Sequence, residues 1–363
     1  MKFNIDKHVL LKPLDQVSKA LPSKATMPIL VGILFQADEN GLTLTASDTS
    51  ISIKAEIQPD DFEMVEPGRI VLPGKKIIDI VRKLTEDLSI EVKGLQVTVK
   101  SGKSKFELMG LDAEEFPLFH EVSGSTVKIP GDKLRSLVNQ TIFATTADQK
   151  TPILTGVHFQ FEENKIKLSG CDRHRLARVE SEFENENVVS VVVSAESLSE
   201  LLKIIDTNPV ELSISHNRFM AKTKEVTFIS RVLEGTYPDV DRTIPTGFNS
   251  LVTVSTSKLF QAIERVYIIA TEEKTNQIVI TVGEELEIES KTEGSHAVES
   301  LEIIGLQGEG FKLSINARYV MDAVKAIDTD KVVIHYVGDM KPLILKGEGE
   351  ENNFQLIQPY RTA

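Results

Sequence analysis

The stretch Pro28-Ile29-Leu30-Val31-Gly32 returns in this chain as Pro152-Ile153-Leu154-Thr155-Gly156, 124 residues further on. Each copy leads into an alternating segment that ends in an aspartate, Asp48 in the first case and Asp172 in the second, again 124 residues apart. Repetition at a fixed period is the sequence signature of a duplicated structural unit. A chain of 363 residues holds almost three such periods, so the repeat predicts three copies of one unit.

Each predicted copy contains two helices with one apolar face. The six apolar patterns are Leu10/Leu14/Val17/Leu21, Ile77/Ile80/Val81/Leu84, Leu134/Leu137/Val138/Thr141/Ile142, Leu198/Leu201/Leu202/Ile205, Leu259/Ile263/Val266/Ile269 and Val320/Ala323/Val324/Ile327. Ser194 and Asn316 are the expected N-caps of the fourth and sixth helices. Most of the remaining sequence alternates with period two between short turns, which is typical of antiparallel strands. The predicted fold class is therefore α+β, with two helices against antiparallel sheets in each copy.

Two polar segments, 120–126 and 246–250, contain Gly or Pro and are the expected junctions between copies. We therefore expect domains at residues 1–122, 123–248 and 249–363. Neither junction is long enough to act as a flexible tether, so the copies should be rigidly arranged.

The composition is that of a soluble globular protein, with 41% hydrophobic and 26% charged residues. No apolar run approaches the roughly 20 residues that cross a bilayer, and the first residues lack the features of a signal peptide. With Cys171 as its one cysteine the chain can form no internal disulfide, which suits a reducing cytosol. We expect a cytoplasmic protein that does not bind membranes.

The net charge of −13 disfavours binding to polyanionic nucleic acid, but the charge is unevenly distributed. The six predicted helical segments together carry +3, so the rest of the chain carries −16. One interpretation is that amphipathic helices present lysine to water. The other is that all six helices face one compartment that holds a polyanion loosely. The charge count alone leaves both open.

A search for catalytic residues finds no active site. The Gly-Lys stretches at 101–104 and 73–76 lack the first glycine of a phosphate-binding loop. Cys171 and His174 lie close in sequence and form the rival hypothesis of a Cys/His enzyme, which is disfavoured because neighbouring side chains on a strand or turn point in different directions. The seven histidines are scattered without metal-ligand spacing, so neither a metal nor a cofactor is expected.

Together, these residues resemble the bacterial DNA polymerase III beta subunits, the sliding clamps, over the whole chain. The motifs that carry the resemblance are Leu11-Lys12-Pro13-Leu14, Met27-Pro28-Ile29-Leu30, Arg69-Ile70-Val71-Leu72-Pro73-Gly74, Pro152-Ile153-Leu154-Thr155-Gly156, Asp172-Arg173-His174-Arg175-Leu176-Ala177, Glu234-Gly235-Thr236-Tyr237-Pro238-Asp239 and Pro359-Tyr360-Arg361-Thr362.

The resemblance implies three equivalent clamp domains per chain and a head-to-tail homodimer that closes a six-domain ring. Its twelve helices would line a hole through which double-stranded DNA passes. The resemblance also implies a processivity factor without catalytic activity. Such a ring tethers the replicative DNA polymerase near the primer end and raises its effective concentration there. The clamp loader and repair proteins would bind the same ring through short linear motifs.

The resemblance also implies three sets of site residues. The partner-peptide pocket would comprise Leu154, Thr155, Cys171, Arg173, His174, Arg175, Leu176, Pro238, Thr243, Leu356, Gln358, Tyr360 and Arg361. The dimer interface would comprise Lys76, Phe106, Leu108, Ile268 and Ile269. The DNA-binding residues would be Lys12, Lys24, Arg82, Lys133, Gln149, Lys150 and Lys203. Without the resemblance, the three pocket leucines would be interpreted as ordinary core residues.

Four positions depart from the family pattern. Cys171 stands where threonine is usual, and Arg173 stands where a small residue is common. Gln358 replaces an apolar residue, and Glu196 follows Ser194-Ala195 where a basic pair is typical. These departures fit a second clamp that is specialised for repair or carried by a mobile element, which stays as an alternative to the replicative clamp.

Overall fold

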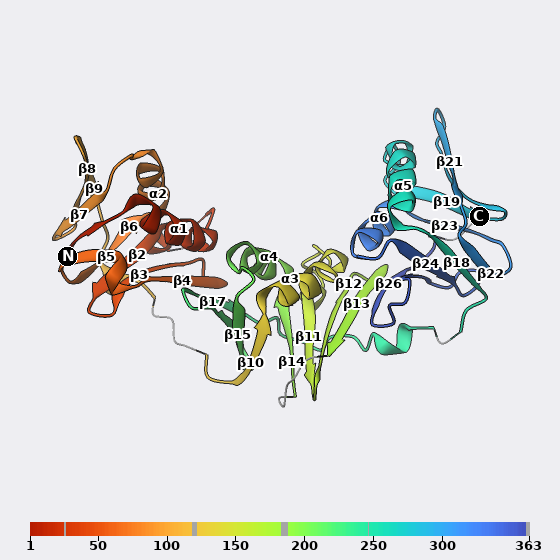
Figure 1. Ribbon diagram of the computed structural model, residues 1–363, viewed down its shortest axis with the longest axis horizontal. Coiled ribbons are helices and arrows are strands. Elements are labelled where there is room, and N and C mark those ends of the chain that lie inside the picture. Colours follow the sequence, from red (N-terminus) through yellow and green to blue (C-terminus); the bar gives the residue numbers. More distant parts are fainter. Residues whose placement is uncertain (25–26, 118–121, 183–187, 246, 361–363) are drawn as a thin grey trace. The chain divides into compact units, whose positions relative to one another are not determined.

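The computed structural model describes residues 1–24, 27–117, 122–182, 188–245 and 247–360. One order of elements occurs three times along the chain (Figure 1). A strand leads into a first helix, four or five antiparallel strands follow, and a second helix leads into three closing strands. The prediction of three α+β copies is therefore confirmed. The predicted junctions 120–126 and 246–250 fall partly outside the described residues.

The bounds of the elements show how closely the copies correspond. The first copy has β1 (Lys2–Ile5), α1 (Lys7–Val17), η1 (Ser18–Ala20), η2 (Pro28–Val31), β2 (Gly32–Asp38), β3 (Gly41–Ser47), β4 (Ile51–Ile57), η3 (Pro59–Asp61), β5 (Phe62–Glu66), β6 (Gly68–Pro73), α2 (Gly74–Lys83), β7 (Leu88–Lys93), β8 (Gln96–Ser101), β9 (Ser104–Met109) and η4 (Ala113–Glu115). The second has β10 (Ser125–Pro130), α3 (Gly131–Asn139), η5 (Ile142–Ala144), η6 (Pro152–Thr155), β11 (Gly156–Glu162), β12 (Lys165–Cys171), β13 (Arg175–Glu182), β14 (Val189–Ser194), α4 (Ala195–Ile204), β15 (Pro209–Ile214), β16 (Arg218–Lys222), β17 (Val226–Arg231) and η7 (Asp241–Thr243). The third has β18 (Ser250–Ser255), α5 (Thr256–Ala270), β19 (Gln277–Val282), β20 (Glu285–Lys291), β21 (His296–Glu302), β22 (Gly305–Gly308), β23 (Phe311–Asn316), α6 (Ala317–Lys325), β24 (Lys331–Tyr336), β25 (Leu343–Gly347) and β26 (Asn353–Ile357).

The chain divides into two compact units rather than three. Unit 1 comprises residues 1–133 and 196–232, and unit 2 comprises residues 134–195 and 233–363. The middle copy is divided because its strands join the sheets of both neighbouring copies. In unit 1, β17 pairs with β4 inside an eight-stranded sheet, and in unit 2, β13 pairs with β26 inside a nine-stranded sheet. A copy is thus a repeat of sequence, whereas each large sheet is built from two copies.

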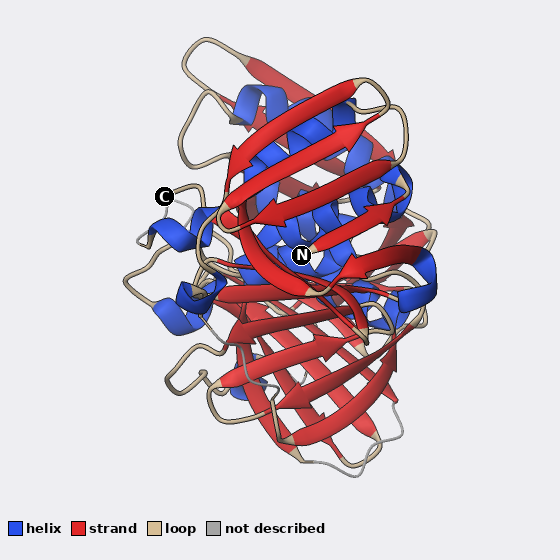
Figure 2. Cartoon of the chain, turned by 90° about the vertical axis from the view of Figure 1, so that its left-hand side faces the viewer, coloured by secondary structure: helices blue, strands red, loops and turns tan. Residues whose placement is uncertain are grey.

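The helices lie against the sheets through the apolar faces that the sequence predicts. Helix α1 buries Leu10, Leu14 and Val17, each of which gains roughly 1.5–3 kcal/mol from burial. The α-helix ends at Val17, because residues 18–20 tighten into the 3₁₀ turn η1, so the predicted pattern to Leu21 is too long. In Figure 2, the strands of the first copy lie in front of its helices.

Polar side chains cap the N-termini of α1 and α6. The carboxylate of Asp6 accepts hydrogen bonds from the N–H groups of His8 (2.6 Å) and Val9 (3.2 Å) at the start of α1. The predicted cap Asn316 is confirmed, because its side-chain oxygen accepts a hydrogen bond from the N–H of Tyr319 at 3.2 Å. Among the described residues, no helix is long and apolar enough to cross a membrane.

Candidate functional site

The predicted partner pocket is built on the tight turn between β12 and β13. Asp172 Oδ1 accepts hydrogen bonds from the N–H groups of His174 (2.9 Å) and Arg175 (3.0 Å), so one carboxylate closes the turn. Arg173, between Asp172 and His174, adopts a left-handed φ of 75°. The turn therefore holds the side chains of residues 173–175 in fixed and different directions.

The first copy contains the same turn with different side chains. Asp48 Oδ1 accepts hydrogen bonds from the N–H groups of Ser50 and Ile51, both at 2.8 Å, and Thr49 has a φ of 81°. The repeated aspartates are therefore structural residues, which explains their spacing of 124 positions. What differs between the copies is the set of side chains that the turn presents.

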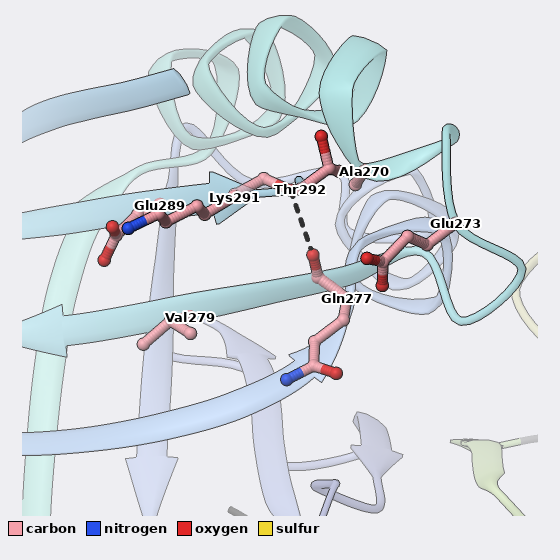
Figure 3. Close-up of a pocket in the computed structure, with 8 residues that line it drawn as sticks. Ala270, Glu273, Gln277, Val279, Glu289, Lys291 and Thr292 are labelled. Atoms are coloured by element: carbon pink, nitrogen blue, oxygen red, sulfur yellow. Dashed lines mark hydrogen bonds between the residues drawn. The ribbon is translucent and has the colours of Figure 1, made fainter. Parts of the chain in front are cut away.

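The third copy places charged groups at this turn. Lys291 pairs with His296 there, as Cys171 pairs with Leu176 in the second copy. A polar hollow of about 420 Å³ lies beside Lys291, and Figure 3 shows the carboxylates of Glu273 and Glu289 at opposite ends of it. None of the predicted site residues lines this hollow. Among the residues that the structure describes, no group of His, Cys, Asp or Glu is arranged to hold a metal ion.

Arg175 connects the turn to the third copy. Its side chain is only 11% exposed, and its Nε and Nη1 atoms donate to Asp172 (3.0 Å) and Asp322 (2.7 Å). The guanidinium carbon lies 4.4 Å from the centre of the Tyr319 ring, close enough for a cation–π contact. Arg175 therefore ties the turn to Tyr319 and Asp322 of α6.

Four predicted pocket residues lie in one apolar cluster. They are Leu154, Cys171, Leu176 and Leu356, all 3–7% exposed. The cluster also contains Val192, Tyr237, Val240, Ile344 and Phe354, with partly buried Ile153, Leu233 and Ile244 against it. Leu176 on β13 faces Leu356 on β26, so the second and third copies each supply one of these leucines. The partly buried members are the part of the cluster that solvent reaches.

The chain after β26 is anchored beside the turn. The N–H of Gln358 donates to the carbonyl of His174 at 2.8 Å, while the Gln358 side chain is exposed. The Tyr360 hydroxyl donates to the carbonyl of Thr275 at 2.7 Å and accepts a hydrogen bond from Asn316 at 3.0 Å. The structure thus brings the predicted residues His174, Gln358 and Tyr360 to one edge. Arg361 lies outside the described residues.

The remaining pocket residues lie at the rim. Thr155 Oγ1 donates to the carbonyl of Pro152 at 2.7 Å, and Thr243 Oγ1 donates to the carbonyl of Val240 at 2.7 Å, while Pro238 is exposed. Arg173 points elsewhere: its Nη2 atom donates to Thr151 at 3.0 Å and lies 3.8 Å from Asp148. Arg173 therefore belongs with the 148–151 turn.

Burial removes the chemical basis of a Cys171 nucleophile. It raises the pKa of the Cys171 thiol above its ordinary value, so the unreactive protonated form dominates at neutral pH. Burial also raises the pKa of the neighbouring Tyr237 hydroxyl, which donates to the carbonyl of Ser169 at 3.1 Å. The thiol is a packing group.

The predicted dimer residues lie on edges and exposed helix faces. Strand β9, which carries Phe106 and Leu108, is an edge of the five-stranded sheet, and Phe106 is 37% exposed. On α5, Ile268 is 68% exposed and Ile269 is partly exposed. Lys76 is exposed on α2. Phe106 and Ile268 are therefore accessible to a second chain.

Most of the predicted DNA-binding residues lie on helices, and the rest lie in the segments between them. Lys12 on α1, Arg82 on α2 and Lys203 on α4 each form an ion pair with a carboxylate. The others are Lys24, exposed between η1 and η2, Lys133 on α3, and Gln149 and Lys150, exposed before η6. Lys12, Arg82 and Lys203 all come from helices of unit 1.

Three family models cover the chain in order. The N-terminal domain of the DNA polymerase III beta subunit matches residues 1–120, the central domain matches residues 128–239, and the C-terminal domain matches residues 241–361. This chain belongs to the DNA polymerase III beta subunit family. As a member of that family it is a sliding clamp, a processivity factor that does no catalysis, so the Cys/His enzyme hypothesis is wrong.

Individual clamps match over the whole chain. The Beta sliding clamps of Bacillus subtilis and Staphylococcus aureus are both 35% identical, over 377 and 378 residues, and all of each chain is covered. The crystal structure of the B. subtilis DNA polymerase sliding clamp gives a TM-score of 0.97 at 33% identity, with both chains fully covered. The clamp from Pseudomonas aeruginosa bound to griselimycin gives 0.93 at 26% identity, also over both full chains.

The clamp contains site residues that the sequence patterns did not reveal. Asn316 is the N-cap of α6, Tyr319 and Asp322 lie within that helix, and the three residues contact Tyr360 or Arg175. No local motif marks them. Asn316 was predicted only as the N-cap of the sixth helix, and Tyr319 and Asp322 lie on that helix outside its predicted apolar face.

Proposed function

We propose that two copies of this clamp close head to tail into a six-domain ring around duplex DNA, with domains at 1–122, 123–248 and 249–363. Two edge strands carry the proposal: among the described residues, β9 and β21 each end a sheet. By position in the repeat, β9 corresponds to β17 and β26, and β21 corresponds to β4 and β13. The β17–β4 and β13–β26 pairs each join a strand equivalent to β9 with a strand equivalent to β21. Because β9 and β21 themselves each end a sheet, they should pair with each other between two chains.

The repeat also predicts the register of this seam. Leu176 corresponds to His296, because each is the first paired residue after its hairpin turn. The paired residues lead from β1 through β7 and β8 to β9 in the first copy, and from β18 through β24 and β25 to β26 in the third. Starting from equivalent residues of β1 and β18, these pairs make Glu107 on β9 the counterpart of Leu356 on β26. Since Leu176 faces Leu356, His296 should face Glu107 of the second copy, and Ala297 should face Phe106.

This register agrees with the predicted apolar contact. Arg265 on α5 binds Glu299 with its Nη2 atom at 2.6 Å, so alternate residues of β21, including Ala297, point toward α5. Phe106 opposite Ala297 would therefore lie on the side where α5 carries Ile268 and Ile269. An antiparallel strand pair would satisfy the backbone groups of both edges, and these apolar side chains would cover it.

The ring is tested by mass and by topology. Sedimentation should give a dimer of twice 40.3 kDa, and a chain that stays monomeric at micromolar concentration contradicts the proposal. Once loaded, the clamp should remain on nicked circular DNA and leave when the circle is cut. Equal retention on circular and linear DNA would indicate ordinary binding. The proposed place of action is the bacterial cytoplasm, where DNA is replicated.

We also propose that short linear motifs of the replicative polymerase, the clamp loader and repair proteins bind at the cluster around Leu176 and Leu356. Apolar peptide side chains would pack on partly buried Ile153 and Ile244, while His174 and Gln358 would meet polar groups at the rim. A peptide with a Gln/Leu/Phe-type motif should bind in a fluorescence titration, and its Leu/Phe→Ala control should not. Equal binding of both peptides would contradict this site.

The exposed Gln358 favours the second candidate, a clamp specialised for repair or a mobile element, because it makes this rim more polar. The two candidates differ in one measurement. A replicative clamp should make its host's replicative polymerase processive on primed circles, whereas a specialised clamp should form the ring and leave that polymerase distributive.

A further inference from the structure

Three of the predicted DNA-binding side chains already hold carboxylates of their own chain. The pairs are Lys12 Nζ with Glu225 Oε2 at 2.6 Å, Arg82 Nη2 with Asp15 Oδ1 at 2.5 Å, and Lys203 Nζ with Glu200 Oε1 at 2.6 Å. All six residues belong to unit 1. Each cation is therefore neutralised where a DNA phosphate would need it.

The pairs are open to solvent rather than part of the core. The side chains of Lys12 and Glu225 are 63% and 52% exposed, and those of Arg82 and Asp15 are 51% and 44% exposed. Exposed ion pairs contribute little to the free energy of folding, so the fold does not depend on these three pairs. Because the side chains are accessible, a phosphate could compete for each cation.

Glu225 is positioned across the repeat. It lies in the turn between β16 and β17 of the second copy, whereas Lys12 lies on α1 of the first, 213 positions earlier. The pairing of β17 with β4 brings this turn to α1, which contacts β4. The N–H of Glu56 donates to the carbonyl of Glu225 at 2.8 Å and helps to hold the turn. The carboxylate is thus held against Lys12 by the sheet rather than by helix geometry.

We propose that Asp15, Glu200 and Glu225 act as built-in counterions that compete with DNA phosphates for Lys12, Arg82 and Lys203. This inference rests on the proposed ring, in which these cations face DNA. A ring is held on DNA by topology, so strong phosphate contacts are unnecessary and would slow its movement. A fixed carboxylate beside each cation weakens the contact, because every new phosphate bond must replace an existing ion pair.

The test removes the carboxylates and measures binding to a short duplex by fluorescence anisotropy. Glu225→Gln should bind roughly two- to fivefold more tightly than the wild type, the range that exposed ion pairs imply. Asp15→Asn/Glu200→Gln/Glu225→Gln should bind roughly ten- to hundredfold more tightly, because distant pairs act independently and their factors multiply. The slope of log affinity against log salt should steepen, by up to about 0.9 for each cation that gains a phosphate.

Glu56→Gln is the matched control. Lys54 and Glu56 form a similar pair at 2.7 Å, and the substitution changes the net charge equally. Their neighbours Ile53 and Ala55 are buried in the strand that α1 contacts, so residues 54 and 56 point away from the helix layer. The control should leave DNA affinity unchanged. An equal gain in the control would mean that net charge alone is responsible, and would overturn the proposal.

A second variant pair isolates the Lys12 contact. Lys12→Gln/Glu225→Gln should bind DNA no more tightly than Lys12→Gln, because Glu225 acts only through Lys12. Unchanged affinity of Glu225→Gln, or a gain that survives the loss of Lys12, would overturn the counterion role. Failure of the ring itself is recognised separately: the wild-type chain would then stay monomeric in sedimentation, whatever its variants do in the duplex assay.

Discussion

Replacing Arg175 with alanine should lower the free energy of unfolding of unit 2 by about 3 kcal/mol. The substitution removes hydrogen bonds to Asp172 and Asp322 and the contact with the Tyr319 ring. It also leaves both carboxylates without their cation, at 10% and 28% exposure of the side chains. Removing one partner of a buried ion pair costs about 3–5 kcal/mol, and the partial exposure of Asp322 favours the lower end.

The matched control is Arg82→Ala, which breaks another Arg–Asp pair. The Arg82–Asp15 distance is 2.5 Å, but both side chains are about half exposed, so the loss should be no more than about 1 kcal/mol. Urea unfolding followed by circular dichroism measures both variants. In the Arg175→Ala background, Asp322→Asn should restore about 1 kcal/mol, because the amide needs no cation. Equal losses for the two arginine variants would refute the reasoning from burial.

Three further predictions concern the seam, the thiol and the pH dependence of stability. Ile268→Ala with Ile269→Ala should weaken the dimer by at least about a hundredfold, since each seam isoleucine that becomes buried gains roughly 1.5–3 kcal/mol; unchanged sedimentation would count against the assigned seam. Cys171→Ala should cost about 1 kcal/mol of stability and leave retention on nicked circular DNA intact, and a loss of retention would assign the thiol a functional role. Burial lowers the pKa of His158 to about 4, below its ordinary value of 6.5, so the unfolded chain takes up the proton first as the pH falls. His158 should therefore lower stability by roughly 1–2 kcal/mol from pH 6.5 to pH 4, and His158→Gln should remove this contribution in urea unfolding at each pH, while His335, whose pKa burial also lowers to about 4, keeps its own.

The repeat predicted the elements better than it predicted the contacts. Asp48 and Asp172 were identified from spacing alone, and each closes its turn through the same hydrogen bonds. The geometry of a turn is set by neighbouring residues, so it is retained wherever a duplication copies that local sequence. The apolar helix faces follow the same logic, because a period of 3.6 residues is also local.

The long-range contacts could not be predicted in this way. Arg175 reaches Asp322, and Lys12 reaches Glu225, only because strands of different copies pair at β13–β26 and β4–β17. These pairings join two copies and are no part of the repeated pattern. For the same reason the sheets group the chain into two compact units, although the sequence repeats three times.

Equivalent positions at the seams differ in a way that supports the proposed partner site in unit 2. In unit 1, Ser52 faces Ile229, which places a hydroxyl beside one apolar side chain. In unit 2, Leu176 faces Leu356, so both sides of the seam are apolar and an apolar peptide side chain can add to them. At the proposed seam between chains, the same position would hold His296 opposite Glu107. A polar pair there suits an interface that must open to admit DNA, because its groups can return to water at little cost. On this proposal, the duplication provides three similar seams, and the two facing side chains set the chemistry of each one.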